Sequence, residues 1–186
     1  MNNLTFSFNN KKIKNIKNPK NLLGGKDSNL EEMGRLSMPF LPGFTISTTV
    51  CDLFYKNKKK LPKQVLKNIK QELKDIEKHT GKKFGDLKNP LLVSVRSGAR
   101  ISMPGMMDTI LNLGLNDQTV KALAKKTLNG RFAKDSYRRF IQMYSNVVLN
   151  IEGHLFESMI DNQKLNSGVL SDTELNESDW DELIER

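Results

Sequence analysis

The chain has 186 residues, 37% of them hydrophobic and 27% charged, which suits one ordinary domain or two small lobes and excludes a wholly disordered chain. No stretch approaches the roughly 18 apolar residues that a membrane-spanning helix needs, and the first ten residues contain no apolar signal core, so neither a membrane span nor secretion is expected. The formal net charge of +9 divides into +13 over residues 1–100 and −4 over residues 101–186, but few aromatic side chains lie between the lysines, so we expect no nucleic-acid partner.

The first part of the sequence combines short strands with helices. Apolar and polar residues alternate at 4–8 and again at 43–48, which predicts a strand at each place. A short helix is expected after the second strand, where Cys51 lies. As the single cysteine it cannot form an internal disulfide, and we interpret it as a small buried residue in a reducing cytoplasm. Apolar residues at helical spacing then predict a long amphipathic helix over 62–79, with Gly81 beyond its end.

The second part begins with a compact apolar strand and then becomes helical. Residues 91–95 predict a strand that runs directly into Arg96, and the stretch 102–109, which contains proline and glycine, predicts a loop. After Gly114 the pattern turns helical, and the strongest apolar stripe of the chain lies between residues 137 and 151.

Together these elements predict an α+β fold with two lobes. Residues 1–112 form the expected α/β lobe, and residues 113–186 form an all-helical lobe that is truncated at its C-terminus. Ser178 is expected to cap the last helix. Because the chain stops soon afterwards, we expect the apolar face of this helix to be exposed, which leaves the end mobile or aggregation-prone. That face consists of Trp180, Leu183 and Ile184.

The run Gly24-Gly25-Lys26 is a candidate phosphate site because it stands before a predicted helix start. Glycines allow close approach of the backbone, a helix N-terminus offers free N–H groups, and the lysine adds positive charge. The run is not a Walker A motif, since Asp27 follows Lys26 where that motif has Ser or Thr. The alternative is a glycine turn with an exposed lysine.

Arg96 is the second candidate for contact with phosphate. An arginine at the end of an apolar strand can bind two phosphate oxygens with its planar guanidinium, and Ser97 and Gly98 leave room for a ligand beside it. The alternative is a structural salt bridge. Arg138 and Arg139, on the long predicted helix, are interpreted as its solvated face.

The two histidines carry no recognisable catalytic or metal-binding pattern. His79 and His154 do not combine with Cys51 or with carboxylates at any metal-ligand spacing, and no partner group for acid–base chemistry is evident. We therefore expect no catalytic residue and no metal ligand in this chain.

Several long runs of the sequence resemble the N-terminal region of the pyruvate, phosphate dikinase family. The resemblance covers about residue 20 to the end, and its runs are 24–33, 42–47, 80–85, 91–99, 102–109, 112–117 and 131–144. Membership implies an ATP-grasp-like nucleotide-binding fold and ATP as a substrate, with Mg²⁺. It also implies phosphoryl transfer through a phosphohistidine on a separate domain, which converts pyruvate to phosphoenolpyruvate.

The resemblance assigns roles to particular positions. The ATP-contacting lysine of the family falls on Lys26, its phosphate-contacting arginine falls on Arg96, and the loop that closes over the phosphates falls on 102–109. The expected ATP- and phosphate-binding residues are Lys26, Arg96, Gly24, Gly25, Ser97, Gly98, Ser102, Met103, Gly105 and Thr109.

The sequence also departs from the family pattern. Asp27-Ser28 stands where the family usually has Gly-Ala, and Ser37 replaces a usual glycine. A carboxylate beside a triphosphate repels it unless a metal ion intervenes, so we expect Asp27 to weaken nucleotide binding. The later half of the nucleotide domain, with its acidic metal ligands, is absent, and so are the phosphohistidine motif and the pyruvate barrel.

Two functional hypotheses follow. The first is a cytoplasmic ATP-binding portion of a dikinase, with a separately encoded remainder as its partner. The alternative is a non-catalytic binding or regulatory module, or a decaying gene fragment, that retains the fold. The sequence leaves the oligomeric state open.

Overall fold

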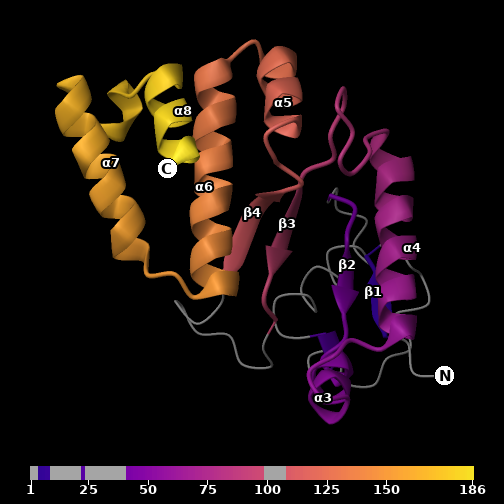
Figure 1. Ribbon diagram of the computed structural model, residues 1–186. Helices are drawn as coiled ribbons and strands as arrows, with labels where there is room; N and C mark the ends of the chain where they lie inside the picture. Colours follow the sequence, from indigo (N-terminus) through magenta and orange to yellow (C-terminus); the bar gives the residue numbers. More distant parts are fainter. Residues whose placement is uncertain (1–3, 9–21, 24–40, 99–107) are drawn as a thin grey trace. The chain divides into compact units, whose positions relative to one another are not determined.

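The computed structural model describes residues 4–8, 22–23, 41–98 and 108–186 (Figure 1). The chain divides into two compact units, one of residues 1–81 and 97–107 and the other of residues 82–96 and 108–186. We call them the first unit and the second unit.

The described residues of the first unit include a two-stranded antiparallel sheet and two helices. Strand β1 (Thr5–Ser7) pairs with β2 (Phe44–Ile46), so that Phe6 lies opposite Thr45. The strands expected at 4–8 and 43–48 are therefore confirmed. Helix α4 (Lys63–Thr80) contacts β1, and the Thr5 hydroxyl donates a hydrogen bond to the Glu72 carboxylate at 3.1 Å.

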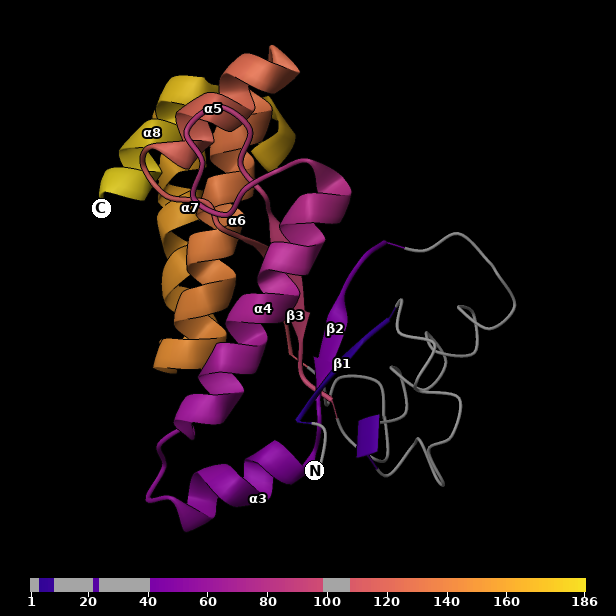
Figure 2. The ribbon, with the colours of Figure 1, turned by 90° about the vertical axis from the view of Figure 1, so that its right-hand side faces the viewer.

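Helices α3 (Thr49–Lys56) and α4 (Lys63–Thr80) follow β2, and in the view of Figure 2 α3 lies below the start of α4. The long amphipathic helix expected at 62–79 is confirmed, and it ends at Gly81, whose φ of 65° is the left-handed conformation that glycine adopts without strain. The interpretation of Cys51 as a buried residue is wrong, since Cys51 is exposed. Helix α3 buries only Val50, because it presents a single narrow contact face.

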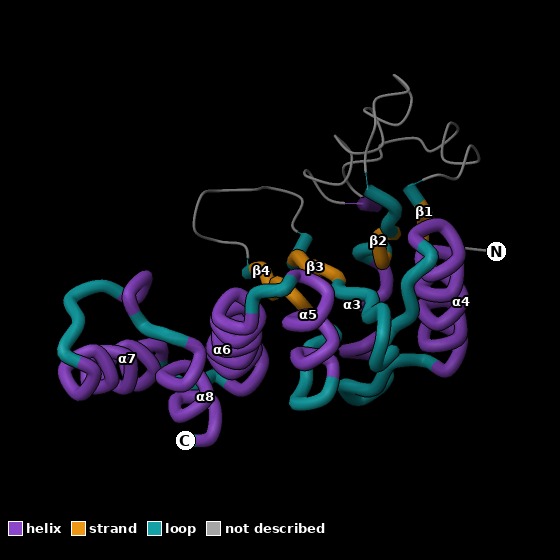
Figure 3. The backbone as a smooth tube through the Cα atoms, turned by 90° about the horizontal axis from the view of Figure 1, so that it is seen from above, coloured by secondary structure: helices purple, strands orange, loops and turns teal. Residues whose placement is uncertain are grey.

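The second unit is a β-hairpin packed against a group of helices. Strands β3 (Val93–Arg96) and β4 (Thr109–Leu113) pair antiparallel. Helix α6 lies between this hairpin and helices α7 and α8, as Figures 1 and 3 show. The remaining elements are α5 (Thr119–Thr127), α6 (Gly130–Leu149), α7 (Gly153–Ser167), the 3₁₀ turn η2 (Asp172–Glu174) and α8 (Glu177–Glu185).

Two apolar clusters hold the second unit together. Next to the hairpin, Leu115 packs with Val120 of α5 and Ala133 of α6. The second cluster joins α7 to α8 and consists of Ile160, Leu175, Trp180 and Leu183. Helix α6 contacts elements of both clusters, because side chains around its axis point in different directions, toward α5 and toward α8.

The end of the chain differs from expectation in two respects. The N-cap of α8 is Asn176, not Ser178: the Asn176 side chain accepts hydrogen bonds from the N–H groups of Ser178 and Asp179, and the Asp179 carboxylate accepts one from the N–H of Asn176. The expected exposure of the apolar face is also wrong, because Trp180 is fully buried and Leu183 is 8% exposed. Helix α8 folds back onto α6 and α7, which cover this face.

The α+β class expected from the sequence is confirmed. The division into lobes at 1–112 and 113–186 stays a prediction, while the compact units group the β3–β4 hairpin with the helices that follow it. Within the described ranges, no helix is both long enough and apolar enough to cross a membrane.

Candidate functional site

Arg96 and Thr109 face one another across the β3–β4 hairpin. Arg96 is the last residue of β3, Thr109 is the first residue of β4, and the two are direct partners in the strand register. Directly opposed residues of an antiparallel pair have side chains on the same face, with Cβ atoms about 4.5–5.5 Å apart. The structure therefore brings these two predicted site residues together, and Ser97 and Gly98 follow Arg96 directly.

The loop expected at 102–109 ends before Thr109, one residue earlier than the sequence pattern indicated. Thr109 belongs to β4 and pairs with Arg96, so its inclusion in the loop is wrong. The sequence of Thr109–Leu113 predicts no strand, because it shows neither strict alternation nor a β-branched run. Pairing with β3 decides the conformation of this segment.

The other expected site residues lie outside the described residues. These residues are Gly24, Gly25, Lys26, Ser102, Met103 and Gly105, and the same holds for Asp27. The sequence also leads us to expect that Lys26 and Arg96 converge on one polyphosphate-sized pocket. This stays a prediction, because Lys26 lies outside the described residues.

A set of short-range contacts fixes the base of the hairpin. Gly114 follows β4 with a φ of 119°, and a Cβ at this position would lie 2.7 Å from the carbonyl oxygen of Leu91, so only glycine fits. The buried Thr119 hydroxyl donates a hydrogen bond to the Gly114 carbonyl at 2.8 Å. The Asn116 side chain accepts hydrogen bonds from the N–H groups of Gln118 and Thr119, each at 2.9 Å. These contacts attach the hairpin that carries Arg96 to α5, at the end where β3 begins and β4 ends.

Arg96 is an exposed residue. Among the residues that the structure describes, none forms an ion pair or hydrogen bond with the Arg96 side chain, so the structural salt bridge finds no support there. The planar guanidinium of an arginine can donate hydrogen bonds to two anionic oxygens at once. A neighbouring threonine hydroxyl adds one further donor. Together these groups can bind a phosphate.

The described residues offer little for acid–base or metal chemistry. In these parts of the chain, no group of three or more His, Cys, Asp or Glu side chains is placed to hold a metal ion. The Tyr137 hydroxyl donates a hydrogen bond to Asp117 at 2.8 Å, and burial together with this contact raises the pKa of Tyr137 to about 12. Tyr137 therefore stays protonated at neutral pH.

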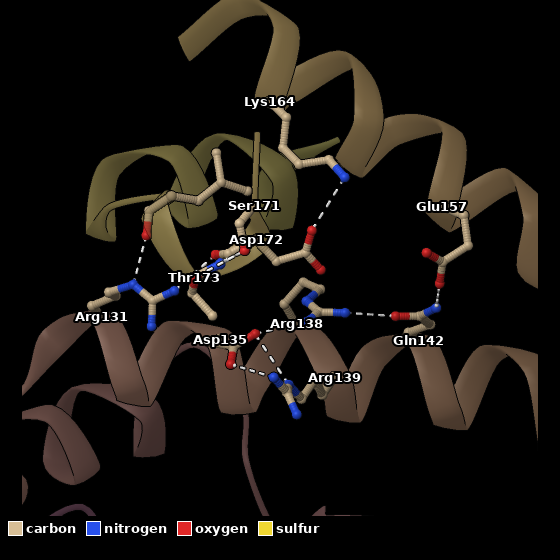
Figure 4. Close-up of polar contacts among 11 residues, drawn as sticks. Arg131, Asp135, Arg138, Arg139, Gln142, Glu157, Lys164, Ser171, Asp172 and Thr173 are labelled. Carbon is tan, nitrogen blue, oxygen red and sulfur yellow. Dashed lines mark hydrogen bonds and ion pairs between the residues drawn. The ribbon is translucent and has the colours of Figure 1, made fainter. Parts of the chain in front are cut away.

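A second group of polar residues lies where α6, η2 and α8 meet (Figure 4). Arg131 donates from Nε to the Leu175 carbonyl at 2.6 Å and from Nη2 to the Asp172 carbonyl at 2.8 Å. Lys164 on α7 forms an ion pair with Asp172 at 3.3 Å. These bonds tie the segment before α8 to α6 and α7, so their role is structural.

The assignment of Arg138 to the solvated face of its helix is wrong. Its side chain is only 12% exposed, and its guanidinium lies 4.8 Å from the centre of the Trp180 ring. It donates hydrogen bonds to Asp135 and Gln142, each at 2.7 Å. Helix α8 covers this face of α6, which the spacing of residues along one helix could not indicate. Arg139, with 62% of its side chain exposed, does lie on the surface.

The ion pairs of Asp135 predict an acid-sensitive contribution to stability. Burial favours a higher pKa for this carboxyl, but hydrogen bonds from Arg138 and Arg139 outweigh it and lower the pKa below its ordinary value. The stabilisation is therefore present above the unfolded-state pKa and is lost as pH falls through the lower folded-state pKa. The stability difference between the wild type and Asp135→Asn should shrink as pH falls from about 5 to about 2.

Urea unfolding across this pH range measures that difference. Asp75→Asn, at an exposed position on α4, is the matched control and should change the free energy of unfolding only slightly. A constant gap between the wild type and Asp135→Asn would contradict the assigned ion pairs.

A shallow depression of about 510 Å³ lies elsewhere on the second unit. None of the expected site residues lines it. Its lining consists of Leu87, Lys88, Asn89, Ala122, Lys125 and Lys126. It is open, its lining is mostly apolar, and neither Arg96 nor Thr109 belongs to that lining.

Comparison with known proteins identifies the family. The model of the domain described as "Pyruvate phosphate dikinase, AMP/ATP-binding domain" matches residues 57–170. The chain is 54% identical over 167 residues to the pyruvate, phosphate dikinase of Clostridium symbiosum, covering 90% of this chain and 19% of that protein. Identity to the enzyme of Entamoeba histolytica is 49% over 166 residues, which are 89% of this chain and 19% of that protein.

A plant relative extends the match over nearly the whole chain. Identity to the chloroplastic pyruvate, phosphate dikinase of Flaveria pringlei is 46% over 181 residues, which are 97% of this chain and 19% of that protein. The chain thus spans about a fifth of the length of these relatives. The resemblance noted in the sequence is confirmed. Since the domain model covers more than half of the residues, this chain belongs to the family of the pyruvate phosphate dikinase AMP/ATP-binding domain.

Proposed function

We propose that this chain is the ATP-binding portion of a dikinase-type phosphotransferase, and that Arg96 and Thr109 hold phosphate oxygens of the nucleotide. The observation that carries the proposal is the pairing of Arg96 with Thr109 at the end of a fixed hairpin. Arg96 is exposed and finds no ion-pair partner among the described residues, so its charge is available to a ligand. Hydrogen bonds from arginine to phosphate are charge-assisted and roughly twice as strong as neutral ones.

The other expected site residues are given roles by the family resemblance. Lys26 is proposed to contact ATP, and Ser97 and Gly98 to approach the phosphates with their backbone. The Mg²⁺ that ATP brings would need ligands, and the described residues hold no suitable cluster of them. We therefore assign no step to a metal ion on this chain.

The chain by itself is expected not to complete the dikinase reaction. Phosphoryl transfer needs neutralisation of developing charge and in-line positioning of donor and acceptor. This chain covers only 19% of the length of the relatives that are named pyruvate, phosphate dikinase. When the purified chain receives ATP, Mg²⁺, phosphate and pyruvate, no phosphoenolpyruvate or AMP should form above the level of a Lys26→Ala, Arg96→Ala double variant. Chromatography of the products is the measurement, and turnover that the double variant lacks would overturn this expectation.

A separately encoded remainder of the dikinase is the proposed partner, and the cytoplasm is the proposed compartment. Mixing the chain with a polypeptide that carries the rest of a related dikinase should restore turnover if the two parts are complementary. Restoration should fail when Arg96→Ala replaces the wild-type chain. Turnover that does not depend on Arg96 would argue against its role in holding phosphate.

The alternative is a non-catalytic module that keeps the fold and binds no ATP. The observation that favours it is Asp27, whose carboxylate follows Lys26 where phosphate is expected. Titration of the chain with MgATP in a calorimeter separates the two hypotheses. Heat that saturates in the wild type, and is weaker in Arg96→Ala, supports ATP binding. The absence of heat at millimolar MgATP supports the alternative.

A further inference from the structure

The β3–β4 hairpin contains one extra residue on β4. Val93 pairs with Leu113, whereas Val95 pairs with Ile110 and Arg96 with Thr109, so the register shifts between the two ends of the hairpin. Between these pairs, β3 has Ser94 alone, and β4 has the two residues Leu111 and Asn112. Two residues opposite one are the defining feature of a β-bulge.

Asn112 is the residue that makes the bulge possible. Its φ is 60°, in the left-handed region, where asparagine is tolerated better than most residues other than glycine. Asn112 is the second of the two bulge residues along the chain. Bulges next to functional sites often change the direction of a side chain. Leu111, the other residue of the bulge, is 43% exposed and contributes little to the core.

The extra residue decides which side chain faces Arg96. Side chains alternate along a strand, so a shift of one residue exchanges the two faces. The base of β4 is anchored, because Gly114 fits against the Leu91 carbonyl and Leu115 packs with Val120 and Ala133. With this base in place, regular pairing without the extra residue would put Leu111 opposite Val95 and Ile110 opposite Arg96.

From this geometry we propose that Asn112 is a positioning residue of the phosphate site. Its left-handed backbone conformation places the hydroxyl of Thr109, instead of the apolar side chain of Ile110, beside the guanidinium of Arg96. Ile110 stays on the covered face, where it is 8% exposed. The ligand class is a phosphate group of a nucleotide, and this inference rests on the proposed function.

The test compares three variants in calorimetric titration with MgATP at low ionic strength. Asn112→Gly should bind like the wild type, because glycine adopts positive φ without strain. Asn112→Val should bind roughly tenfold more weakly, because a β-branched residue resists the left-handed conformation and one charge-assisted contact is misplaced. Leu111→Thr is the matched control at the neighbouring position of the bulge and should leave affinity unchanged.

A double-variant cycle separates positioning from a general loss of structure. If Asn112 acts through the Arg96 site, Asn112→Val should have little further effect on affinity when Arg96 is already alanine. Full additivity of the two losses would overturn the proposal, and so would wild-type affinity of Asn112→Val. If Arg96→Ala leaves affinity unchanged, the proposed function itself is wrong, and this result is distinguishable from a failure of Asn112→Val alone.

Thr109→Val tests the same phosphate contact independently, even if Asn112→Val does not fold. Valine has nearly the shape of threonine and favours a strand, so the hairpin is retained while the hydroxyl is lost. The affinity for MgATP should fall severalfold, as expected for one lost hydrogen bond. Circular dichroism melting checks that the variant is folded. A folded Thr109→Val with wild-type affinity would overturn the proposal, because the hydroxyl would then contribute nothing at Arg96.

Discussion

Replacing Trp180 with alanine is expected to lower the free energy of unfolding by about 3–5 kcal/mol. Trp180 is fully buried in the cluster that joins α7 to α8, and the Arg138 guanidinium lies 4.8 Å from its ring centre. Alanine would leave a cavity, and Arg138 would lose its contact with the aromatic ring. Urea unfolding followed by circular dichroism is the suitable measurement, since Trp180 is the only tryptophan and the variant has no indole fluorescence.

Two further variants make this expectation specific. The indole nitrogen of Trp180 is buried without an acceptor among the described residues, so Trp180→Phe gives up no hydrogen bond and should retain most of the stability. Leu170→Ala, at a position 95% exposed, should change the free energy of unfolding by less than about 0.5 kcal/mol. Equal effects of Trp180→Ala and Leu170→Ala would show that α8 does not pack on α6 and α7.

Replacing Arg96 with alanine is expected to weaken MgATP binding by about ten- to a hundredfold, the effect of losing hydrogen bonds between a cation and phosphate. The fold should be preserved, because Arg96 is exposed and forms no ion pair with any described residue. Calorimetric titration of folded variants measures the loss. Arg96→Lys should recover part of the affinity, since it keeps the charge and loses the planar fork.

The matched control for this experiment is Arg139→Ala. Arg139 has 62% of its side chain exposed, carries the same charge and lies on α6, where it forms an ion pair with Asp135. Arg138 is unsuitable as a control, because its removal would disturb the contact with Trp180. If Arg139→Ala weakens binding as much as Arg96→Ala, the nucleotide is held by general attraction to a basic protein. Strong binding of the control and weak binding of Arg96→Ala support a specific phosphate contact.

Local sequence patterns by themselves determined most of the helices and three of the strands. The long helix at 62–79 was predictable because its apolar spacing matches one helical face, and its end at Gly81 was predictable because glycine tolerates positive φ. Family membership was also predictable, since runs such as 91–99 and 102–109 are long and specific. Arg96 was identified as a candidate from its place at the end of an apolar strand, and it does end β3.

Tertiary structure alone decided the contacts between segments far apart in the sequence. Helical spacing indicates only which residues share a face of one helix. It could not indicate that α8 folds back onto α6, which buries Trp180 and brings it against Arg138. Strand pairing likewise decided that Thr109 lies opposite Arg96, because the bulge at Asn112 has its effect only once β4 is paired with β3. The physical reason is common to both cases: a side chain's neighbours along the chain set its local conformation, and its partners across the fold set its burial and its role.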